Sequence, residues 1–527
     1  MLILRHNELS ADDLFLIERK MVKLADPEQP FDWSLHDDLL SKSRPEVYGS
    51  IIGLLKRTGF CSSLGITTSE FLDFLIDVDH GYEDNPYHSF YHAADVAMVL
   101  YHMLKDYDVS DYLSSIDMAA LMIAALCHDI GHPGMNNNYQ VNMNTELSQR
   151  YHNLSVLESY SCSIAMDLLT KHQLLYNVEE IGKEHGIPTS EEKIRKFIVK
   201  AILATDMICH YQLQANLNGL LEFISAEDSH KVLPTVTDLF STRGQDSPLI
   251  YFEEHYFSES STCCSRSRPK SACEFLPAEE TVESAAFVSP KYPLTEGQRQ
   301  ALCEILLHAA DISNAVRPWD ICLKWSNLVC IEFFRQGEAE KQAGLPVSPN
   351  MDRHQVNQAT IGAQFSDFIV RPYFELFVSL FPKAKELLVN LQDNRKRWAM
   401  EGSDAEEEED ESGEEIEVPS THDEEKRLGD HPPFLGFPTA AFNPGRRLSA
   451  AAGTIVLPSR ASRRPFINMR SSSHSSLEKW GNLSSNNEES VEVKNRRKSE
   501  QDEFYRNSTS SIESSPPRRV VNNLFVS

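Results

Sequence analysis

Apolar side chains recur every three or four residues along residues 1–400 of this 527-residue chain. This spacing places them on one face of successive α-helices, whereas the alternation typical of strands is rare. The pattern therefore predicts an all-α fold, a compact multi-helix bundle. The first helix is expected to begin at Ser10, because Ser10 and Asp13 can cap its free amide groups.

Charge and hydropathy limit the classes of partner. The chain carries 50 basic and 78 acidic side chains, a net charge of −28, which repels nucleic acid and anionic membrane surfaces. Its longest purely apolar run, residues 118–127, is too short to span a bilayer. The ten cysteines form no CxxC pair, which argues against a disulfide framework or a cysteine-rich zinc site. We therefore expect a reducing compartment, the cytosol or the nucleus.

Two stretches lack the helical spacing. Residues 226–296 are rich in Ser, Pro, Glu and Arg, which predicts a largely mobile insertion between two helices. Residues 401–430 carry 15 acidic and 2 basic groups, and residues 431–527 carry 8 acidic and 14 basic groups. This composition predicts a disordered tail that is first acidic and then basic and serine-rich. The tail is either a phosphorylated regulatory segment or an inert solubilising extension.

Two segments combine metal-ligand residues with helical spacing. His88 and His92 are four residues apart, so a helix would place them on one face about 6 Å apart. One of them can then bind a metal while the other donates a proton. His128 and Asp129 directly follow the apolar run at 118–127, so we expect them at the buried end of a helix. Ionisable groups are costly there unless they are paired or metal-bound.

Two further segments add to this set. His308 and Asp311 close a second apolar helix, and Thr205 with Asp206 forms a weaker fourth segment. Each of these residues could instead be a hydrogen-bonded core side chain or a helix cap. Taken together, the histidines and aspartates suit a hard or borderline divalent ion with open coordination positions. Because the sequence has no P-loop, GxSxG or HExxH motif, a helical metal hydrolase is the class that remains.

The motifs NPYHxxxHAADV at 85–96 and HDxxHPGxxN at 128–137 resemble those of the class I cyclic nucleotide phosphodiesterases, an all-helical fold of the HD superfamily. The resemblance covers roughly residues 82–382, and it is nearest to the high-affinity type-9-like branch. Together with the spacing and composition described above, it predicts N-terminal helices at 1–80 that pack on the catalytic body, a catalytic domain at 81–395 and a disordered regulatory tail at 396–527. It also implies hydrolysis of cyclic AMP, cyclic GMP or both to 5′-nucleoside monophosphates.

The resemblance assigns roles to individual residues. It implies two divalent metal ions, the first usually Zn²⁺ and the second Mg²⁺ or Mn²⁺, with Asp129 bridging them. The ligands of the first ion match His92, His128, Asp129 and Asp311, and the partners of the waters on the second ion match His132, Glu158 and Thr205. His88 matches the general acid that protonates the departing 3′ oxygen, and Glu332 the carboxylate that orients it.

The purine site also follows from the resemblance, with one departure. Val329 and Phe365 match the side chains that sandwich the base, and Asn314 lies beside the nucleotide. The family glutamine that hydrogen-bonds the base lies three residues before the phenylalanine, where this chain has Gly362. Gln364 is displaced from that position by two residues, which turns a helical side chain by about 200°, so it is not expected to reach the base. Consequently the preferred nucleotide cannot be read from the sequence.

A second departure is Ile331, where the family usually has an acidic residue. Two alternatives to catalysis of cyclic nucleotide hydrolysis stay open: another HD-type nucleotide phosphohydrolase, and a non-catalytic cyclic-nucleotide sensor or scaffold. In the tail, Arg446-Arg447-Leu448-Ser449 and residues 496–499 resemble the substrate motif of cyclic-AMP-dependent protein kinase. Ser449 and Ser499 are therefore candidate phosphorylation sites, and this kinase is a candidate partner.

Overall fold

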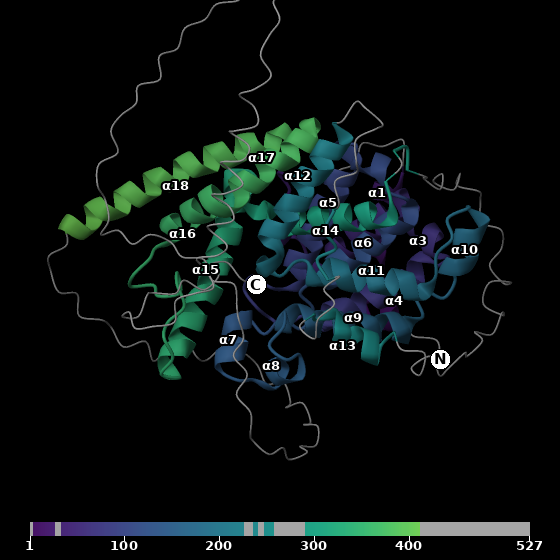
Figure 1. Cartoon of the computed structure of the whole chain (residues 1–527), viewed down its shortest axis with the longest axis horizontal. Coiled ribbons are helices and arrows are strands. Elements are labelled where there is room, and N and C mark those ends of the chain that lie inside the picture. Colours follow the sequence, from purple (N-terminus) through teal and green to yellow (C-terminus); the bar gives the residue numbers. More distant parts are fainter. Residues whose placement is uncertain are drawn as a thin grey trace, which may run out of the picture. The chain divides into compact units, whose positions relative to one another are not determined.

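A computed structural model describes residues 4–26, 33–225, 236–240, 247–257, 290–292 and 294–411, of which 403–411 are described by their backbone only. All regular elements in these ranges are helical, which confirms the all-α fold (Figure 1). The first helices are α1 (Ala11–Ala25), α2 (Arg44–Arg57), α3 (Phe60–Leu64), α4 (Thr68–His80), α5 (Phe90–Asp106), α6 (Ser115–Cys127), α7 (Asn137–Asn142), α8 (Glu146–Arg150) and α9 (Val156–His172). They are followed by α10 (Val178–Glu184), α11 (Glu191–Leu203), α12 (His210–Ile224), α13 (Leu249–His255), α14 (Glu296–Asp311), α15 (Trp319–Gln342), α16 (Gln358–Phe365), α17 (Arg371–Leu380) and α18 (Lys385–Glu411).

Short helical turns join several of these helices. They are the 3₁₀ turns η1 (Arg5–Glu8), η2 (Leu39–Ser41), η3 (Val109–Tyr112), η4 (Met207–Cys209), η7 (Ile312–Val316) and η9 (Pro382–Ala384), and the π-helical turn η8 (Ser366–Val370). The expected start of the first α-helix is confirmed. Ser10 accepts a hydrogen bond from the Asp13 amide, and the Asp13 carboxylate accepts one from the Ser10 amide.

Helix α6 runs through the middle of the hydrophobic core. Residues 118–127 are all buried, as their uniformly apolar sequence predicts. Helices α5, α9, α11 and α14 pack around α6, and this core continues into the N-terminal helices α2 and α4. Because α6 ends inside this core, the residues that follow it are delivered to the interior of the protein.

The other elements that shape the site lie at the C-terminal part of the bundle. Helix α16 packs between α15 and the long helix α18, which runs along the top of the view in Figure 1. Trp398 of α18 is buried in a small apolar cluster with Cys322 of α15 and Ala359 of α16. This cluster packs α18 against α15 and α16, two helices that follow Asp311 in the sequence.

A buried arginine joins the N-terminal segment to the bundle. Arg317 has no solvent exposure, and its guanidinium donates to both carboxylate oxygens of Asp95 at 3.0 and 2.8 Å. It also donates to the carbonyl oxygens of Leu35 and Asp37 at 2.7 and 2.8 Å. All of these hydrogen bonds compensate for desolvation of the charge. The division into 1–80, 81–395 and 396–527 itself stays a prediction.

Two sequence-based boundaries need correction. Helix α18 continues to Glu411, so the chain is helical for 11 residues beyond Met400, where the tail composition begins. Within the expected mobile insertion, residues 249–255 form helix α13, because Leu249 and Phe252 are apolar enough to be buried against the bundle. The prediction is therefore wrong for these residues. The rest of the tail, for which disorder was expected and which contains Ser449 and Ser499, lies outside the described residues.

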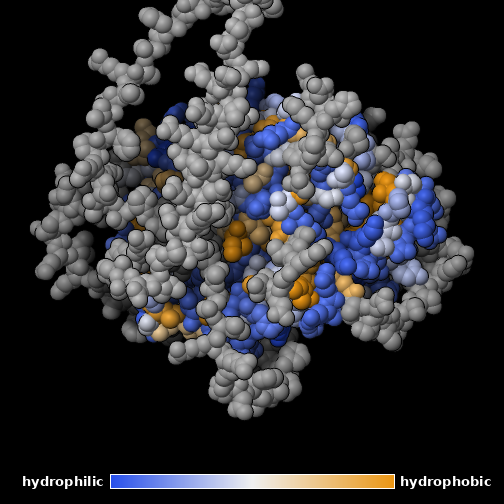
Figure 2. All heavy atoms as spheres, viewed as in Figure 1, coloured by the Kyte–Doolittle hydropathy of each residue, from blue (hydrophilic) through white to orange (hydrophobic). Residues whose placement is uncertain are grey.

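The face of the described residues that Figure 2 shows is mainly polar. Figure 2 shows hydrophilic residues over most of the coloured face, with smaller hydrophobic areas between them. Among the described helices, none combines the length and the apolar character that a bilayer crossing requires.

Candidate active site

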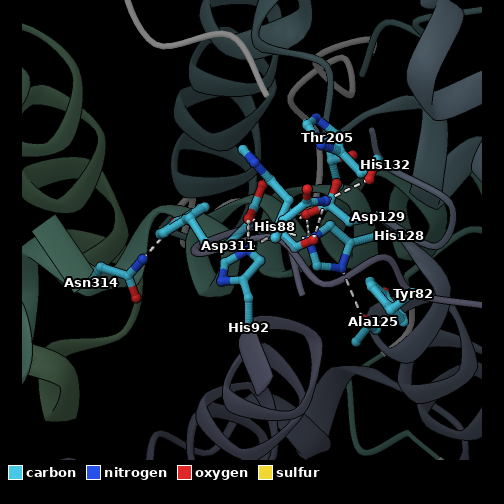
Figure 3. Close-up of polar contacts among 12 residues, drawn as sticks. Tyr82, His88, His92, Ala125, His128, Asp129, His132, Thr205, Asp311 and Asn314 are labelled. Carbon is cyan, nitrogen blue, oxygen red and sulfur yellow. Dashed lines mark hydrogen bonds and ion pairs between the residues drawn. The ribbon is translucent and has the colours of Figure 1, made fainter. Parts of the chain in front are cut away.

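Three helices bring four predicted metal ligands together. His92 lies in α5, His128 caps the C-terminus of α6 with Asp129 next to it, and Asp311 ends α14. Their ligand atoms all lie within 4.8 Å of one another, and Figure 3 shows the four side chains converging. His92 Nε2 is 3.0 Å from Asp311 Oδ1, and His128 Nε2 is 3.0 Å from Asp129 Oδ2.

The hydrogen bonding of His128 fits a cation at this point. Its Nδ1 lies 2.9 Å from the Ala125 carbonyl oxygen, which can only accept, so Nδ1 carries the proton. Its Nε2 faces the carboxylates of Asp129 and Asp311; burial lowers the pKa of His128, but these two carboxylates outweigh it and raise that pKa well above its usual range. A divalent ion bound here would take the place of the Nε2 proton. Burial raises the pKa of Asp311, but His128 and His92 more than offset it and lower that pKa below its usual range. Ionised carboxylates and imidazole lone pairs directed at one point suit a divalent metal ion.

His88 lies beside this cluster, but not in the way its spacing predicts. Helix α5 begins at Phe90, so His88 precedes the helix, and the expectation of a shared helix face with His92 is wrong. The cause is that the chain turns at 85–89, where Asn85 donates to the carbonyl oxygens of His88 and His132. The rings of His88 and His92 nevertheless lie 6.1 Å apart between centroids.

Glu332 of α15 holds His88 in place. Its Oε2 accepts a hydrogen bond of 2.6 Å from His88 Nδ1, and its Oε1 accepts from the amides of Tyr87 and His88. Burial lowers the pKa of His88, but the charge and hydrogen bond of Glu332 outweigh it and raise that pKa above its usual range. In turn, burial raises the pKa of Glu332, but His88 lowers it to about 2. The charge and the hydrogen bond of Glu332 therefore favour the protonated ring of His88.

The three residues expected near the second ion are all buried. His132 stacks on His88 with 3.9 Å between ring centroids. Glu158 of α9 accepts from the Asn137 amide group at 2.9 and 3.2 Å, and the Thr205 hydroxyl donates to the Ile202 carbonyl oxygen at 2.7 Å. Figure 3 shows His132 and Thr205 on the same side of Asp129.

A cavity opens directly from this cluster. It holds about 820 Å³ of empty space, including open solvent at its mouth. Asp311, His88 and Thr205 line it where it meets the cluster, and Asn314, Val329 and Phe365 also line it. Asn314 donates a hydrogen bond of 2.5 Å to the Tyr87 hydroxyl, which holds its amide at the wall. The structure thus brings the predicted metal, acid and base-binding residues to one cavity.

The displaced glutamine lies on the other side of α16. Gly362 and Phe365 line the cavity, whereas Gln364 lines a separate groove between α16 and α18 and is 3.4 Å from Asn350 Nδ2. The predicted orientation of Gln364 is confirmed. Ile331 is 43% exposed on α15, so its difference from the usual acidic residue changes the surface rather than the cavity.

Sequence reasoning missed several residues of the cavity wall. The Tyr87 ring packs against the His92 ring with 4.5 Å between centroids and 33° between planes, and Tyr87 directly precedes His88 in the motif at 85–96. Trp325 also lines the cavity, one helical turn before Val329, where helical periodicity could have found it. Trp398 had no such signal, because it lies far along the chain on α18.

Relatives of known function match this part of the chain. Residues 87–391 match the 3′5′-cyclic nucleotide phosphodiesterase family. The human high affinity cGMP-specific 3′,5′-cyclic phosphodiesterase 9A is 29% identical over 329 residues, which are 62% of this chain and 43% of that protein. The 3′,5′-cyclic-nucleotide phosphodiesterase regA of Dictyostelium discoideum is 29% identical over 327 residues, 62% of this chain and 32% of that protein. The chain thus spans less than half the length of these relatives.

Solved structures show the same fold. The phosphodiesterase domain of the Salpingoeca rosetta rhodopsin phosphodiesterase matches with a TM-score of 0.55 and 21% identity, covering 74% of this chain and 97% of that one. The structure of LmjPDEB1 in complex with IBMX matches with a TM-score of 0.54 and 21% identity, covering 75% and 99%. Because the family match spans residues 87–391, which include all four clustered ligands and the His88–Glu332 pair, the expected resemblance, with its type-9-like branch, is confirmed, and this chain belongs to the 3′5′-cyclic nucleotide phosphodiesterase family.

Proposed function

We propose that this chain hydrolyses 3′,5′-cyclic nucleotides to 5′-nucleoside monophosphates. The observation that carries the proposal is the 2.6 Å hydrogen bond between His88 Nδ1 and Glu332 in the wall of the cavity that Asp311 also lines. A proton donor beside a cation-binding cluster suits cleavage of a phosphate ester, since the departing oxygen needs a proton while the phosphoryl oxygens need positive charge.

His92, His128, Asp129 and Asp311 would hold the first divalent ion, and Asp129 would also contact a second. When bound, the two ions supply a water activated for attack on phosphorus and neutralise the phosphoryl oxygens. Mixed histidine and aspartate ligands favour Zn²⁺ at the first site. Coordination mainly by water, with His132, Glu158 and Thr205 around it, favours Mg²⁺ or Mn²⁺ at the second.

The side chains of the cavity supply the remaining steps. His88 donates its proton to the 3′ oxygen as the bond to phosphorus breaks, and Glu332 keeps that proton on His88 until then. Val329 and Phe365 sandwich the purine, and Asn314 borders the nucleotide. A positioned acid contributes about 10²–10⁴ in rate.

The test is product analysis with the purified full chain. Cyclic AMP and cyclic GMP are offered separately with Mg²⁺ or Mn²⁺, and we expect 5′-AMP or 5′-GMP. Asp129→Ala should lose more than about 90% of turnover and bound metal, because a lost ligand removes metal affinity. Asp393→Ala, which removes an exposed carboxylate of α18, is the control. Failure to hydrolyse either nucleotide, or retention of activity by Asp129→Ala, would contradict the proposal.

We propose separately that cyclic-AMP-dependent protein kinase modifies Ser449 and Ser499. Two arginine-led motifs in one serine-rich segment support it, and each phosphate adds about −1.5 to −2 charge to the basic tail. The consequence is negative feedback, in which the kinase releases the tail from the acidic body. Site mapping by mass spectrometry after kinase treatment tests this, with a double Ser449→Ala, Ser499→Ala variant as control. If neither serine is modified, the tail is a solubilising extension.

A further inference from the structure

One wall of the cavity is formed by a tryptophan from the last described helix. Trp398 of α18 is 2% exposed, yet its ring lines the same cavity as Phe365 and Val329. The groove on the other side of α16, where Gln364 lies, is also lined by Trp398. The indole is therefore the partition between the candidate active site and the outer groove.

Gly362 of α16 makes room for this indole. A Cβ atom at position 362 would lie 2.6 Å from Trp398 Cε2 and 2.9 Å from Nε1, closer than carbon atoms approach in proteins. Glycine within a helix costs about 1 kcal/mol relative to alanine, so its presence here is explained by space rather than by backbone conformation. The indole occupies the volume into which any side chain at 362 would project.

The indole is held on its other sides. The ring of Trp319 packs against it with 4.6 Å between centroids and 64° between planes. Cys322 and Ala359 complete the same buried cluster, with Ala363 packed on it. A ring confined in this way is a rigid wall rather than a movable gate.

The position of Trp398 determines which part of a bound nucleotide it would contact. In the proposed binding mode, a cyclic nucleotide with its phosphate at Asp311 and His88 would have its base between Val329 and Phe365, with the outer edge of the base toward Gly362 and Trp398, which line the same cavity. Indole offers an apolar surface and a single N–H donor and accepts no hydrogen bond, whereas adenine and guanine present opposite groups at position 6. An indole at this position therefore discriminates between bases by their size far better than by their hydrogen-bonding groups.

We infer that Trp398 is the specificity-determining residue of the base-binding end, where it sets the depth of the cavity and excludes purines that carry a bulky group on that edge. The inference rests on the proposed function. Adenine and guanine would both contact Trp398, so the inference applies to cyclic AMP and cyclic GMP alike.

The first experiment compares two substrates, cyclic AMP and cyclic AMP with a benzyl group on its exocyclic amine. Trp398→Ala should raise the ratio of kcat/KM for the bulky substrate to that for cyclic AMP by about tenfold or more. Val389→Ala truncates an exposed side chain of the same helix that does not line the cavity, and it should leave the ratio within about twofold. An unchanged ratio in Trp398→Ala, or an equal change in Val389→Ala, overturns the inference. If Trp398→Ala does not fold, Trp398→Phe is used, with a smaller gain.

The second experiment does not depend on hydrolysis. Binding of AMP and GMP is measured by calorimetry for Gly362→Ala, Trp398→Leu and the double variant. Gly362→Ala should weaken both nucleotides about fivefold or more, because its methyl group displaces the indole, and the double variant should recover to within about twofold of Trp398→Leu. Additive effects, or wild-type binding by Gly362→Ala, overturn the inference. A chain that hydrolyses no cyclic nucleotide but shows this coupling refutes the proposed function alone.

Discussion

At the scale of single residues, the pair His88–Glu332 connects two positions 244 residues apart through a hydrogen bond of 2.6 Å. The charge of Glu332 counteracts the burial that would otherwise deprotonate His88. A general acid must be protonated to act, so the proposed activity depends on this balance.

The balance predicts a specific pH profile. In the wild type, kcat/KM should fall as the pH rises through the raised pKa of His88. Glu332→Gln removes the charge and leaves burial, so the pKa of His88 should drop and the alkaline limb should move to lower pH by about one unit or more. Steady-state kinetics between pH 5 and pH 10 measure this. Glu338→Gln, which changes an exposed carboxylate on the same helix, is the control, and an unshifted limb in Glu332→Gln would refute the role of Glu332.

At the scale of elements, helix α16 presents different residues to its two sides. Phe365 lines the cavity and Gln364 the outer groove, although they are neighbours in sequence. Phe365→Ala should raise KM about tenfold for both cyclic nucleotides, because stacking on an aromatic ring contributes about 1–3 kcal/mol and is insensitive to the identity of the base. Gln364→Ala should change KM less than about twofold. A large, base-selective effect of Gln364→Ala would show that this glutamine reaches the purine.

Helix α14 carries a second buried carboxyl away from the cluster. Glu304 is 3% exposed, accepts from Gln300 Nε2 at 3.0 Å, and burial raises its pKa to about 8. Its ordinary pKa is 4.5, so the folded state binds the proton more tightly than the unfolded state. The resulting stabilisation is complete below pH 4.5 and is lost as the pH rises through about 8.

Glu304→Gln should therefore be stabilising at high pH only. An amide cannot ionise, so we expect the unfolding temperature to exceed that of the wild type at pH 8.5 and to match it at pH 4, with a shift on the order of 2–4 °C per kcal/mol. Thermal unfolding at both pH values measures the difference. The control is Glu296→Gln, an exposed carboxylate in the first turn of the same helix. Equal shifts at both pH values would contradict the assigned pKa.

At the scale of the whole molecule, the ligand cluster joins α5, α6 and α14 at one point inside the shared core. A bound cation should stabilise this junction, by about 2.7 kcal/mol when its concentration is a hundred times the Kd. We expect a chelator to lower the unfolding temperature by about 5 °C and added Zn²⁺ to restore it. Differential scanning calorimetry measures this shift. Asp129→Ala should be insensitive to the chelator, and an insensitive wild type would count against a metal in the cluster.

Much of the fold and part of the site followed from local sequence. The cap at Ser10, the buried helix over 118–127 and the position of Asp311 at a helix end each depend on residues within a few turns of one another. Spacing, capping and burial of this range are governed by backbone geometry and the hydrophobic effect, which act on any chain with that sequence. The orientation of Gln364 followed from the same helical geometry.

Only the tertiary structure decided the remaining features. The turn at 85–89 places His88 before α5 through hydrogen bonds to Asn85, and its carboxylate partner comes from a helix far along the chain. Likewise, the sequence shows only that position 362 has no side chain, whereas the structure shows that Trp398 occupies the volume such a side chain would need. The physical reason is that such contacts depend on how helices pack. The sequence around Gly362 contains no information about Trp398, because that ring belongs to another helix.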